Sequence, residues 1–264
     1  MIITTHEGIE FTQIRRYGTD CFVHIIDLTK VVLKIRNGFM SVTDAVSISG
    51  AQLGFNAGGW GLWKNKSLPN EYLIIEGRVV SAQSYDLRPC LHISKAGNLE
   101  FLNRPNFSTS WNVVGFDRII AAGGVYNTRI NDNASNPRTI YGKDVTGRLV
   151  ILVCDGRLPE QKGLTFKEGW EVMKEFDVTD CGNADGGYSS AAVNTALAPA
   201  LLNKSYLGEV PPRRVVYQVL INAKKTGNTS PPPLPPEPPK QVVKIIDATV
   251  RYEVDGVMHT QVLK

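Results

Sequence analysis

The sequence lacks the residue patterns that mark several common kinds of site. Its four cysteines include no Cys-x-x-Cys pair and its four histidines are scattered, so no zinc knuckle is predicted. It has no Gly-x-Gly-x-x-Gly after a strand and no Gly-Lys-Ser/Thr, which leaves it without a nucleotide-binding motif. Ser189 and Ser190 stand outside a Gly-x-Ser-x-Gly frame, so a Ser-His-Asp hydrolase is unsupported.

Long apolar runs and clusters of basic residues are also missing. No apolar stretch reaches the ~18 residues that a membrane-spanning helix needs, so no membrane span is predicted. The segment Met1–Glu7 lacks the basic and apolar regions of a signal peptide. We therefore expect a protein made in the cytoplasm without a signal peptide, with release by lysis or association with a particle as alternatives. The net charge of +4 is too small an excess to predict a nucleic-acid partner.

What the chain does contain is typical of a globular protein with a sizeable core. Hydrophobic residues make up 42% of the sequence and charged residues 20%. Many short runs predict strands, and few segments predict helices, which indicates a strand-rich α+β (mixed α/β) domain. The expected strands are Phe22–Leu28, Val31–Arg36, Tyr72–Ile75, Arg78–Ala82, Leu91–Ile93, Ile119–Ala122, Thr139–Lys143, Leu149–Cys154 and Val215–Ile221.

Two helices are expected. One begins near Thr43 and runs toward Ser49. The other begins at Thr165, because Glu168 follows three residues later and completes a capping box. Its apolar residues recur at helical spacing and are interpreted as core rather than as part of a cofactor site.

A proline-rich segment divides the chain. Seven of the eleven residues from Ser230 to Lys240 are prolines, which favours a semi-rigid polyproline spacer over helix or inner strand. The sequence thus predicts a domain over 1–229, a linker over 230–240 and a small module over 241–264.

The C-terminal module is expected to be a β-hairpin. Strands are predicted over Val242–Tyr252 and Val257–Leu263, with the turn dipeptide Asp255-Gly256 between them. Because a lone hairpin is marginally stable in water, we expect this module to dock on the main domain, on another copy of the chain as a homo-oligomer, or on a partner.

Three glycine-rich clusters are candidates for a site. They are Gly54–Gly61, Val153–Arg157 and Cys181–Ser190, and glycine allows backbone N–H groups to approach a ligand closely. Each cluster taken alone is also typical of an ordinary turn, and Asp-Gly is among the commonest turn dipeptides.

The order of these clusters resembles the phosphodiester glycosidase family. The resemblance covers roughly residues 8 to 223 and leaves out the segment after Pro231. Three positions depart from the family pattern: Tyr188 replaces the third glycine of Asp-Gly-Gly-Gly, Ala57 is inserted in the Asn-Gly-Gly turn, and Arg213 stands where an acid is frequent. The matching segments are Gly8–Phe11, Asn56–Trp60, Asn136–Gly142, Val153–Arg157 with Gly163–Thr165, Asn183–Gly187 and Arg214–Val216.

The resemblance implies a site that binds and cleaves a sugar phosphodiester. Asp185 is the expected catalytic carboxyl, and Asp155 is the expected second carboxyl, because glycosidases commonly use a pair. Arg138 is expected to bind the phosphate, since a guanidinium matches two phosphate oxygens at once. A calcium or magnesium ion held by the aspartates is an alternative, and the metal is left open.

Further residues are expected to contact the substrate. Asparagines and a serine would hydrogen-bond to sugar hydroxyls or to the phosphate. Two arginines would contact the substrate, or they would pair with the aspartates or form surface ion pairs. The expected substrate-binding residues are Asn56, Gly58, Gly59, Asn183, Gly186, Gly187, Ser189, Arg157 and Arg214.

The expected function is hydrolysis of a glycosyl phosphodiester in a glycan or cell-wall polymer. The alternative is a non-catalytic glycan-binding or structural module of a phage virion, in which residues 241–264 contact a virion partner. A third interpretation is sugar recognition through Trp60, Trp63 and Trp111, although buried tryptophans are more common.

Overall fold

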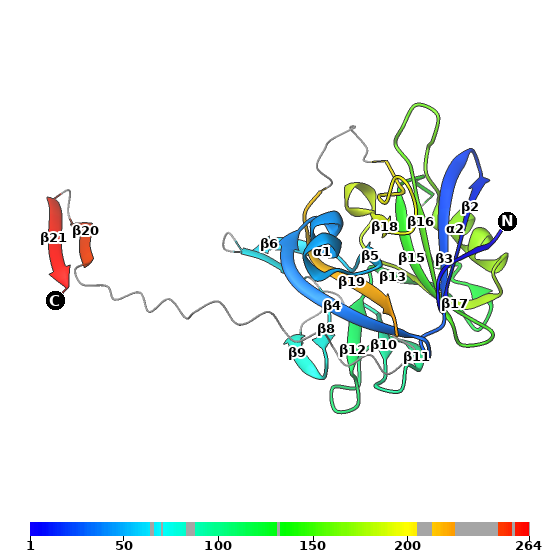
Figure 1. The fold of residues 1–264 in the computed structure, drawn as a ribbon, viewed down its shortest axis with the longest axis horizontal. Coiled ribbons are helices and arrows are strands. Elements are labelled where there is room, and N and C mark those ends of the chain that lie inside the picture. Colours follow the sequence, from blue (N-terminus) through cyan, green and yellow to red (C-terminus); the bar gives the residue numbers. More distant parts are fainter. Residues whose placement is uncertain are drawn as a thin grey trace. The chain divides into compact units, whose positions relative to one another are not determined.

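The protein is described from a computed structural model, over residues 1–63, 66–69, 71–82, 88–130, 133–204, 213–224, 248–254 and 257–263. The chain divides into two compact units, residues 1–224 and 225–264. Within the described residues, the larger unit contains three multistranded sheets and two α-helices (Figure 1). This arrangement confirms the predicted strand-rich α+β class.

The largest sheet is antiparallel and has eight strands in the order β1-β2-β3-β16-β15-β17-β13-β14. Its inner strands β3, β16 and β15 are joined by long, regular ladders. The bounds are β1 (Ile3–His6), β2 (Ile9–Arg16), β3 (Thr19–Ile26), β13 (Arg118–Ala122), β14 (Val125–Tyr126), β15 (Arg138–Asp144), β16 (Leu149–Cys154) and β17 (Val178–Asn183).

Two smaller sheets and one short ribbon complete the larger unit. The four-stranded sheet has the order β18-β5-β19-β4, the five-stranded sheet has the order β11-β10-β12-β8-β9, and β6 pairs with β7. The bounds are β4 (Val31–Met40), β5 (Leu53–Asn56), β6 (Trp60–Trp63), β7 (Lys66–Pro69), β8 (Leu73–Ile75), β9 (Arg78–Ser81), β10 (Cys90–Ile93), β11 (Leu99–Leu102), β12 (Asn112–Gly115), β18 (Ala192–Asn194) and β19 (Val215–Ala223).

The core lies on both faces of the eight-stranded sheet. One cluster joins this sheet to the two smaller sheets, and a second cluster joins its other face to α2 (Phe166–Lys174). Strand β16 is buried on both faces, which explains its continuous apolar sequence. Alternate residues of β16 enter the two clusters: Leu149, Ile151 and Val153 the first, and Val150, Leu152 and Cys154 the second.

The two helices cover outer faces of the layered sheets. Helix α1 (Val42–Ser49) packs its buried residues against the four-stranded sheet, while α2 packs on the eight-stranded sheet. Figure 1 shows the two helices on opposite sides of the larger unit. Both predicted helices are confirmed, and α2 begins at the predicted capping box: the N–H of Glu168 donates to Thr165 Oγ1 over 3.1 Å, and that of Thr165 donates to Glu168 Oε2 over 2.8 Å.

All strands predicted for residues 1–229 overlap observed strands, but the sequence pattern misses others. Strand β17 is the most consequential omission, because its last residue is Asn183 at the candidate site. Its sequence alternates poorly, since Thr179 and Asp180 are polar and only half-buried. Strand β17 lies between β15 and β13, so pairing on both sides defines a strand that local sequence does not.

The second unit contains a two-stranded antiparallel hairpin, β20 (Ala248–Val254) and β21 (Val257–Leu263). Its register pairs Val254 with Val257 next to the predicted turn. The bounds of the second strand match the prediction, and the first strand is observed from Ala248 on. The predicted linker over 230–240, and the beginning of the first hairpin strand, lie outside the described residues.

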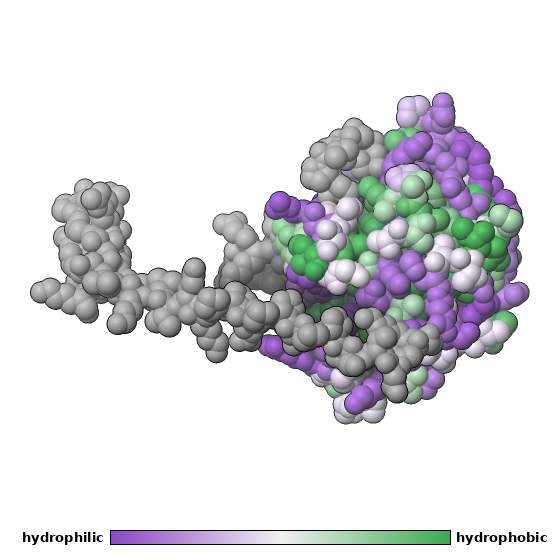
Figure 2. Space-filling view, viewed as in Figure 1, coloured by the Kyte–Doolittle hydropathy of each residue, from purple (hydrophilic) through white to green (hydrophobic). Residues whose placement is uncertain are grey.

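On the face shown in Figure 2, hydrophobic areas are interrupted by hydrophilic ones. No helix among the described residues is long and apolar enough to cross a membrane. The four cysteines are buried free thiols.

The capping box makes the start of α2 sensitive to one substitution. We expect Thr165→Ala to lower the free energy of unfolding by about 1 kcal/mol, because the N–H of Glu168 loses its acceptor. Thr165→Ser retains an acceptor oxygen and should stay within a few tenths of a kcal/mol of the wild type. Urea denaturation measures both variants, and an unchanged midpoint for Thr165→Ala would contradict this account of the helix start.

Candidate active site

Two of the three glycine-rich clusters meet where the four-stranded sheet approaches the eight-stranded sheet. The first follows β5 of the four-stranded sheet, and the other follows β17 of the eight-stranded sheet. The backbone N–H of Asp185 donates to the carbonyl of Ala57 over 3.0 Å. The side-chain amide of Asn56 donates to the carbonyl of Asp185 over 2.7 Å. These contacts hold the two loops together.

The loops border a polar cleft of about 360 Å³. Such a volume lies near the lower end of the range for small-ligand sites. Charged side chains from separate parts of the chain line it. The lining arginines are Arg88, Arg138, Arg157 and Arg213, and the lining acids are Glu71, Asp117 and Asp185.

Glu71 is a fully buried carboxylate in the wall of this cleft. It accepts hydrogen bonds from the N–H of Gly59 over 2.9 Å and from the hydroxyl of Tyr217 over 3.3 Å. Its other oxygen lies 3.1 Å from Nη1 of Arg88. Burial outweighs these partners and raises the pKa of Glu71 to about 7, so this carboxyl exchanges a proton near neutral pH.

Gly58 and Gly115 give Glu71 the space that it occupies. A Cβ atom at Gly58 would lie well inside van der Waals contact with a carboxylate oxygen of Glu71 and with the hydroxyl of Tyr217. A Cβ atom at Gly115 would collide with the Cβ of Glu71. The Ala57-Gly58-Gly59 turn therefore packs around Glu71, which explains the need for glycine there.

Asp185 is the second carboxyl of the cleft, and it is half-buried. Burial raises its pKa, while the hydroxyl of Ser189, the positive charge of Arg213 and the N–H of Gly186 act in the opposite direction. Its negative charge also contributes to the raised pKa of Glu71, so an ionised Asp185 favours the protonated form of Glu71. Two carboxyls with raised pKa in one cleft are typical of acid–base chemistry.

The arginines are held in different ways. Arg88 lies between Glu71 and Asp117, with its Nη1 3.6 Å from Asp117 Oδ1. Arg138 is buried: its Nε donates to the carbonyl of Leu164 and its Nη2 to that of Ala134, while its guanidinium lies 3.8 Å from the ring centre of Phe166. Phe166, the first residue of α2 after its N-cap, thus packs its ring against the guanidinium of Arg138 and helps to position it.

Several residues expected in the site lie in the cleft lining. Besides Arg138, Asp185 and Arg157, these are Gly59, Asn183, Gly186 and Gly187. Their parts in binding or chemistry stay predictions.

Other expected residues lie outside the lining. Asn56 is fully buried, and its amide bonds the loops instead of facing the cleft. Ser189 is buried and supports Asp185, and Gly58 lies behind Glu71. Arg214 is exposed, and its neighbour Arg213 lines the cleft in its place.

Asp155, the expected second carboxyl, is also not part of the lining. Its Oδ1 accepts the N–H of Lys204 over 2.6 Å, and burial raises its pKa to about 6. The cleft pairs Asp185 with Glu71 instead, a residue without a recognisable motif around it. Arg88 and Asp117 likewise stand in ordinary sequence, and only the fold brings these three side chains together.

The remaining candidates do not add a site. Trp111 is half-buried and lies outside the cleft lining, and the side chains of Trp60 and Trp63 lie outside the described residues. Within the part of the chain that the structure describes, no group of three or more His, Cys, Asp or Glu residues is placed to hold a metal ion.

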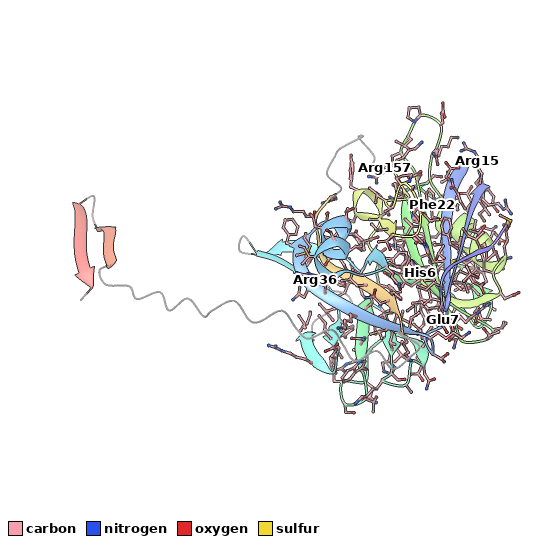
Figure 3. All side chains as sticks on the ribbon, in the orientation of Figure 1. His6, Glu7, Arg15, Phe22, Arg36 and Arg157 are labelled. Atoms are coloured by element: carbon pink, nitrogen blue, oxygen red, sulfur yellow. The ribbon has the colours of Figure 1, made fainter. Side chains whose placement is uncertain are left out.

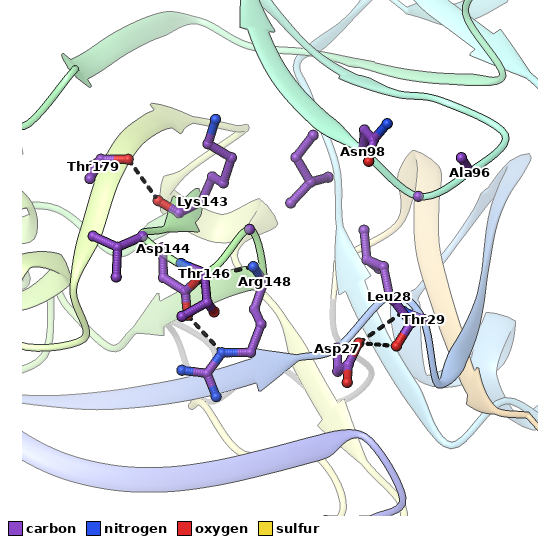
Figure 4. A pocket seen from close by; sticks show the side chains of 14 residues that line it. Asp27, Leu28, Thr29, Ala96, Asn98, Lys143, Asp144, Thr146, Arg148 and Thr179 are labelled. Carbon is purple, nitrogen blue, oxygen red and sulfur yellow. Dashed lines mark hydrogen bonds and ion pairs between the residues drawn. The ribbon is translucent and has the colours of Figure 1, made fainter.

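A larger cavity of about 680 Å³ lies elsewhere, between the β3–β4, β10–β11 and β15–β16 connections (Figure 4). Its two aspartates already have partners: Arg148 Nε lies 2.7 Å from Asp144 Oδ2, and Asp27 Oδ1 accepts from the N–H and the hydroxyl of Thr29. Each aspartate there has local hydrogen-bond donors, so we place the candidate chemistry in the smaller cleft.

Paired carboxyls beside four arginines define a cleft suited to acid–base chemistry on an anionic ligand. The fold resembles the catalytic domain of zebrafish N-acetylglucosamine-1-phosphodiester alpha-N-acetylglucosaminidase, auto-inhibited by its pro-peptide, with a TM-score of 0.66, 15% identity and coverage of 85% of this chain and 87% of that chain. A hypothetical protein from Synechocystis is similar with a TM-score of 0.68, 12% identity and coverage of 84% and 63%.

The sequence model of the phosphodiester glycosidase family matches residues 29–221. The chain therefore belongs to the phosphodiester glycosidase family, as the order of its motifs predicts. No curated protein sequence matches the chain.

The raised pKa of Glu71 makes stability depend on pH in a defined window. Because the folded state holds this proton more tightly than the unfolded state does, the free energy of unfolding falls as the pH rises from 4.5 to about 7. We expect Glu71→Gln to remove this contribution. The difference in unfolding free energy between wild type and variant should change across the window and level off on either side. A difference that stays constant from pH 4 to 8 would contradict the burial of an ionisable Glu71.

Proposed function

We propose that the cleft hydrolyses a glycosyl phosphodiester, a sugar whose anomeric oxygen is one of the two ester oxygens of a phosphodiester. Family membership and fold support a glycosidase-type activity, and the substrate is the proposal. The observation that carries it is the pairing of Glu71 and Asp185 among four arginines in one cleft.

The residues divide the work by their chemistry. Arginines bind the non-bridging phosphate oxygens, because a guanidinium offers parallel N–H donors and a fixed positive charge. As the bond between the anomeric carbon and the phosphate oxygen breaks, negative charge develops on the departing phosphate. The nearby arginines stabilise that charge. The backbone N–H groups of the glycine-rich turns add further donors at the same edge of the cleft.

Proton transfer falls to the two carboxyls. Water supplies the hydroxyl that the anomeric carbon gains. The other proton of the water is taken up by the protein, and the departing phosphomonoester receives one proton in return. One carboxyl, protonated near neutral pH, donates to the leaving oxygen, and the other, ionised, receives a proton or faces the anomeric carbon. Glu71, with a pKa of about 7, suits the donor and Asp185 the acceptor.

Turnover of a chromogenic N-acetylglucosamine 1-phosphodiester tests the proposal. We expect hydrolysis by the wild type, and a fall in kcat of about 10²–10⁴-fold in Asp185→Asn and in Glu71→Gln, the usual loss when a general acid or base is removed. Asp155→Asn is the matched control: its carboxyl lies outside the cleft lining, so a folded variant should lose far less.

The remaining outcomes are also informative. Full activity in Asp185→Asn would contradict the assignment. Loss of turnover on adding a chelator would support the calcium or magnesium ion that the sequence leaves open. No turnover on a panel of related diesters would favour the non-catalytic alternative, a glycan-binding or virion module, and direct glycan binding would then be measured.

A further inference from the structure

The two carboxylate oxygens of Glu71 have different surroundings. Oε2 accepts the N–H of Gly59 over 2.9 Å and the hydroxyl of Tyr217 over 3.3 Å. Oε1 lies 3.1 Å from Nη1 of Arg88. Arg88, beside Oε1, lines the cleft, whereas Tyr217, beside Oε2, is not part of the lining. The two oxygens are therefore not equivalent as carriers of a proton.

The glycines next to Glu71 show which oxygen is nearer the cleft. A Cβ atom at Gly59, which lines the cleft, would lie 3.0 Å from Oε1. A Cβ atom at Gly58, which lies outside the lining, would collide with Oε2 and with the hydroxyl of Tyr217. Oε1 is thus the oxygen on the cleft side of the carboxyl, and Oε2 is the oxygen on the interior side.

Tyr217 holds the interior oxygen. It lies on β19 and is fully buried, in a unit whose interior is filled with side chains (Figure 3). Among the residues that the structure describes, Oε2 of Glu71 is the hydrogen-bond acceptor of its hydroxyl. A proton on Oε2 would take this acceptor away and leave a buried hydroxyl unpaired, which is costly, and it would compete with the N–H of Gly59. A proton on Oε1 leaves both hydrogen bonds intact.

The partner of Oε1 is easier to replace. The side chain of Arg88 is 29% exposed, and its Nη1 lies 3.6 Å from a second carboxylate oxygen, Oδ1 of Asp117. Water and Asp117 therefore compensate its N–H donors when Oε1 carries a proton. Asp185 also acts on Glu71, and its negative charge favours the protonated form. The lower cost at Oε1 decides where that proton resides.

We propose that Tyr217 is a positioning residue that directs the acid proton of Glu71 to Oε1, the oxygen on the cleft side. This rests on the proposed function and deepens it, because Glu71 is the proton donor to the leaving oxygen there. The O–H of the carboxyl then lies on the side of the substrate. Once the proton has moved from Oε1 to the leaving oxygen, the carboxylate has Arg88, Gly59 and Tyr217 as donors.

The carbonyl stretch of protonated Glu71 in the infrared spectrum of the full chain tests the inference without turnover. The band is recorded at a pH well below about 7, the pKa of Glu71, and assigned as the one that Glu71→Gln removes. With the proton on Oε1, the C=O oxygen is Oε2, and each hydrogen bond to it lowers the stretching frequency. We expect the band to move to higher frequency in Tyr217→Phe, which loses one donor and retains the ring.

Tyr141→Phe is the matched control. Tyr141 is as deeply buried as Tyr217, and its hydroxyl donates to the carbonyl of Asn56 instead of to Glu71. This variant loses one buried hydroxyl as well, but the band should stay in place. Arg88→Gln probes the other oxygen. Because the guanidinium of Arg88 contacts Oε1, the band should stay near its wild-type frequency in this variant too.

Tyr217→Phe should also raise the pKa of Glu71, because the hydroxyl stabilises the ionised carboxylate. The unfolding free energies of this variant with and without Glu71→Gln should diverge up to a higher pH than the wild-type pair does. The expected shift of that upper end is about one pH unit, or about tenfold in proton affinity. The basic limb of the pH profile of kcat/KM should move by the same amount. Tyr141→Phe should shift neither.

An unmoved band in folded Tyr217→Phe would overturn the inference, and so would an equal shift in Tyr141→Phe. If Tyr217→Phe does not fold, Arg88→Gln decides, because a band that moves to higher frequency there means that Oε1 is the C=O oxygen and Oε2 carries the proton. The proposed function fails separately. If no diester is hydrolysed but the band moves as expected, Tyr217 still directs the proton of Glu71. If a diester is hydrolysed and the band does not move, only the inference on Tyr217 is wrong.

Discussion

The buried amide of Asn56 is the interaction on which the arrangement of the cleft depends. Its Oδ1 accepts from the hydroxyl of Thr139 over 2.7 Å and from the N–H of Ala191 over 2.9 Å, and its Nδ2 donates to the carbonyl of Asp185 over 2.7 Å. The hydroxyl of Tyr141 donates to its carbonyl. One residue of the four-stranded sheet is thereby bonded to β15 of the eight-stranded sheet and to the loop that carries Asp185. Because each unpaired buried group would cost about 1–3 kcal/mol, the two sheets and the loop are fixed relative to one another.

This fixed frame makes it feasible to bury a carboxyl beside a second one. Glu71 is fully buried, and its negative charge is balanced by Arg88, by the N–H of Gly59 and by the hydroxyl of Tyr217. These partners do not cancel the cost of burial, so the pKa of Glu71 rises to about 7. The same frame that holds the carboxyl therefore also sets its proton affinity at a value useful for acid–base chemistry at neutral pH.

The sequence predicts the parts of this structure that local patterns determine. The continuous apolar run of β16, the capping box at Thr165 and the two glycine-rich loops at Asn56 and Asn183 are all recovered, because buried strands, helix starts and tight turns each leave a local signature. Asp155 shows the limit: its Asp-Gly dipeptide resembles that of Asp185, but its carboxyl bonds the N–H of Lys204 outside the cleft lining.

The residues that sequence reasoning missed are brought into the cleft by tertiary structure alone. Glu71, Arg88 and Asp117 come from three separate segments without a shared motif. The one local trace of Glu71 is indirect, in the glycines at 58 and 115 that leave room for it. Tyr188 is visible in the sequence as a departure from the family pattern, yet its contacts with Arg157 and Arg213 become apparent only in the fold.

The most direct test of the central claim is a crystal structure of the protein with a non-hydrolysable glycosyl phosphonate diester. The account predicts that the phosphonate oxygens lie among the arginines of the cleft, with the anomeric carbon between Glu71 and Asp185. Binding of the ligand in the larger cavity beside Asp144 and Arg148, or at any place away from the two carboxyls, would contradict it.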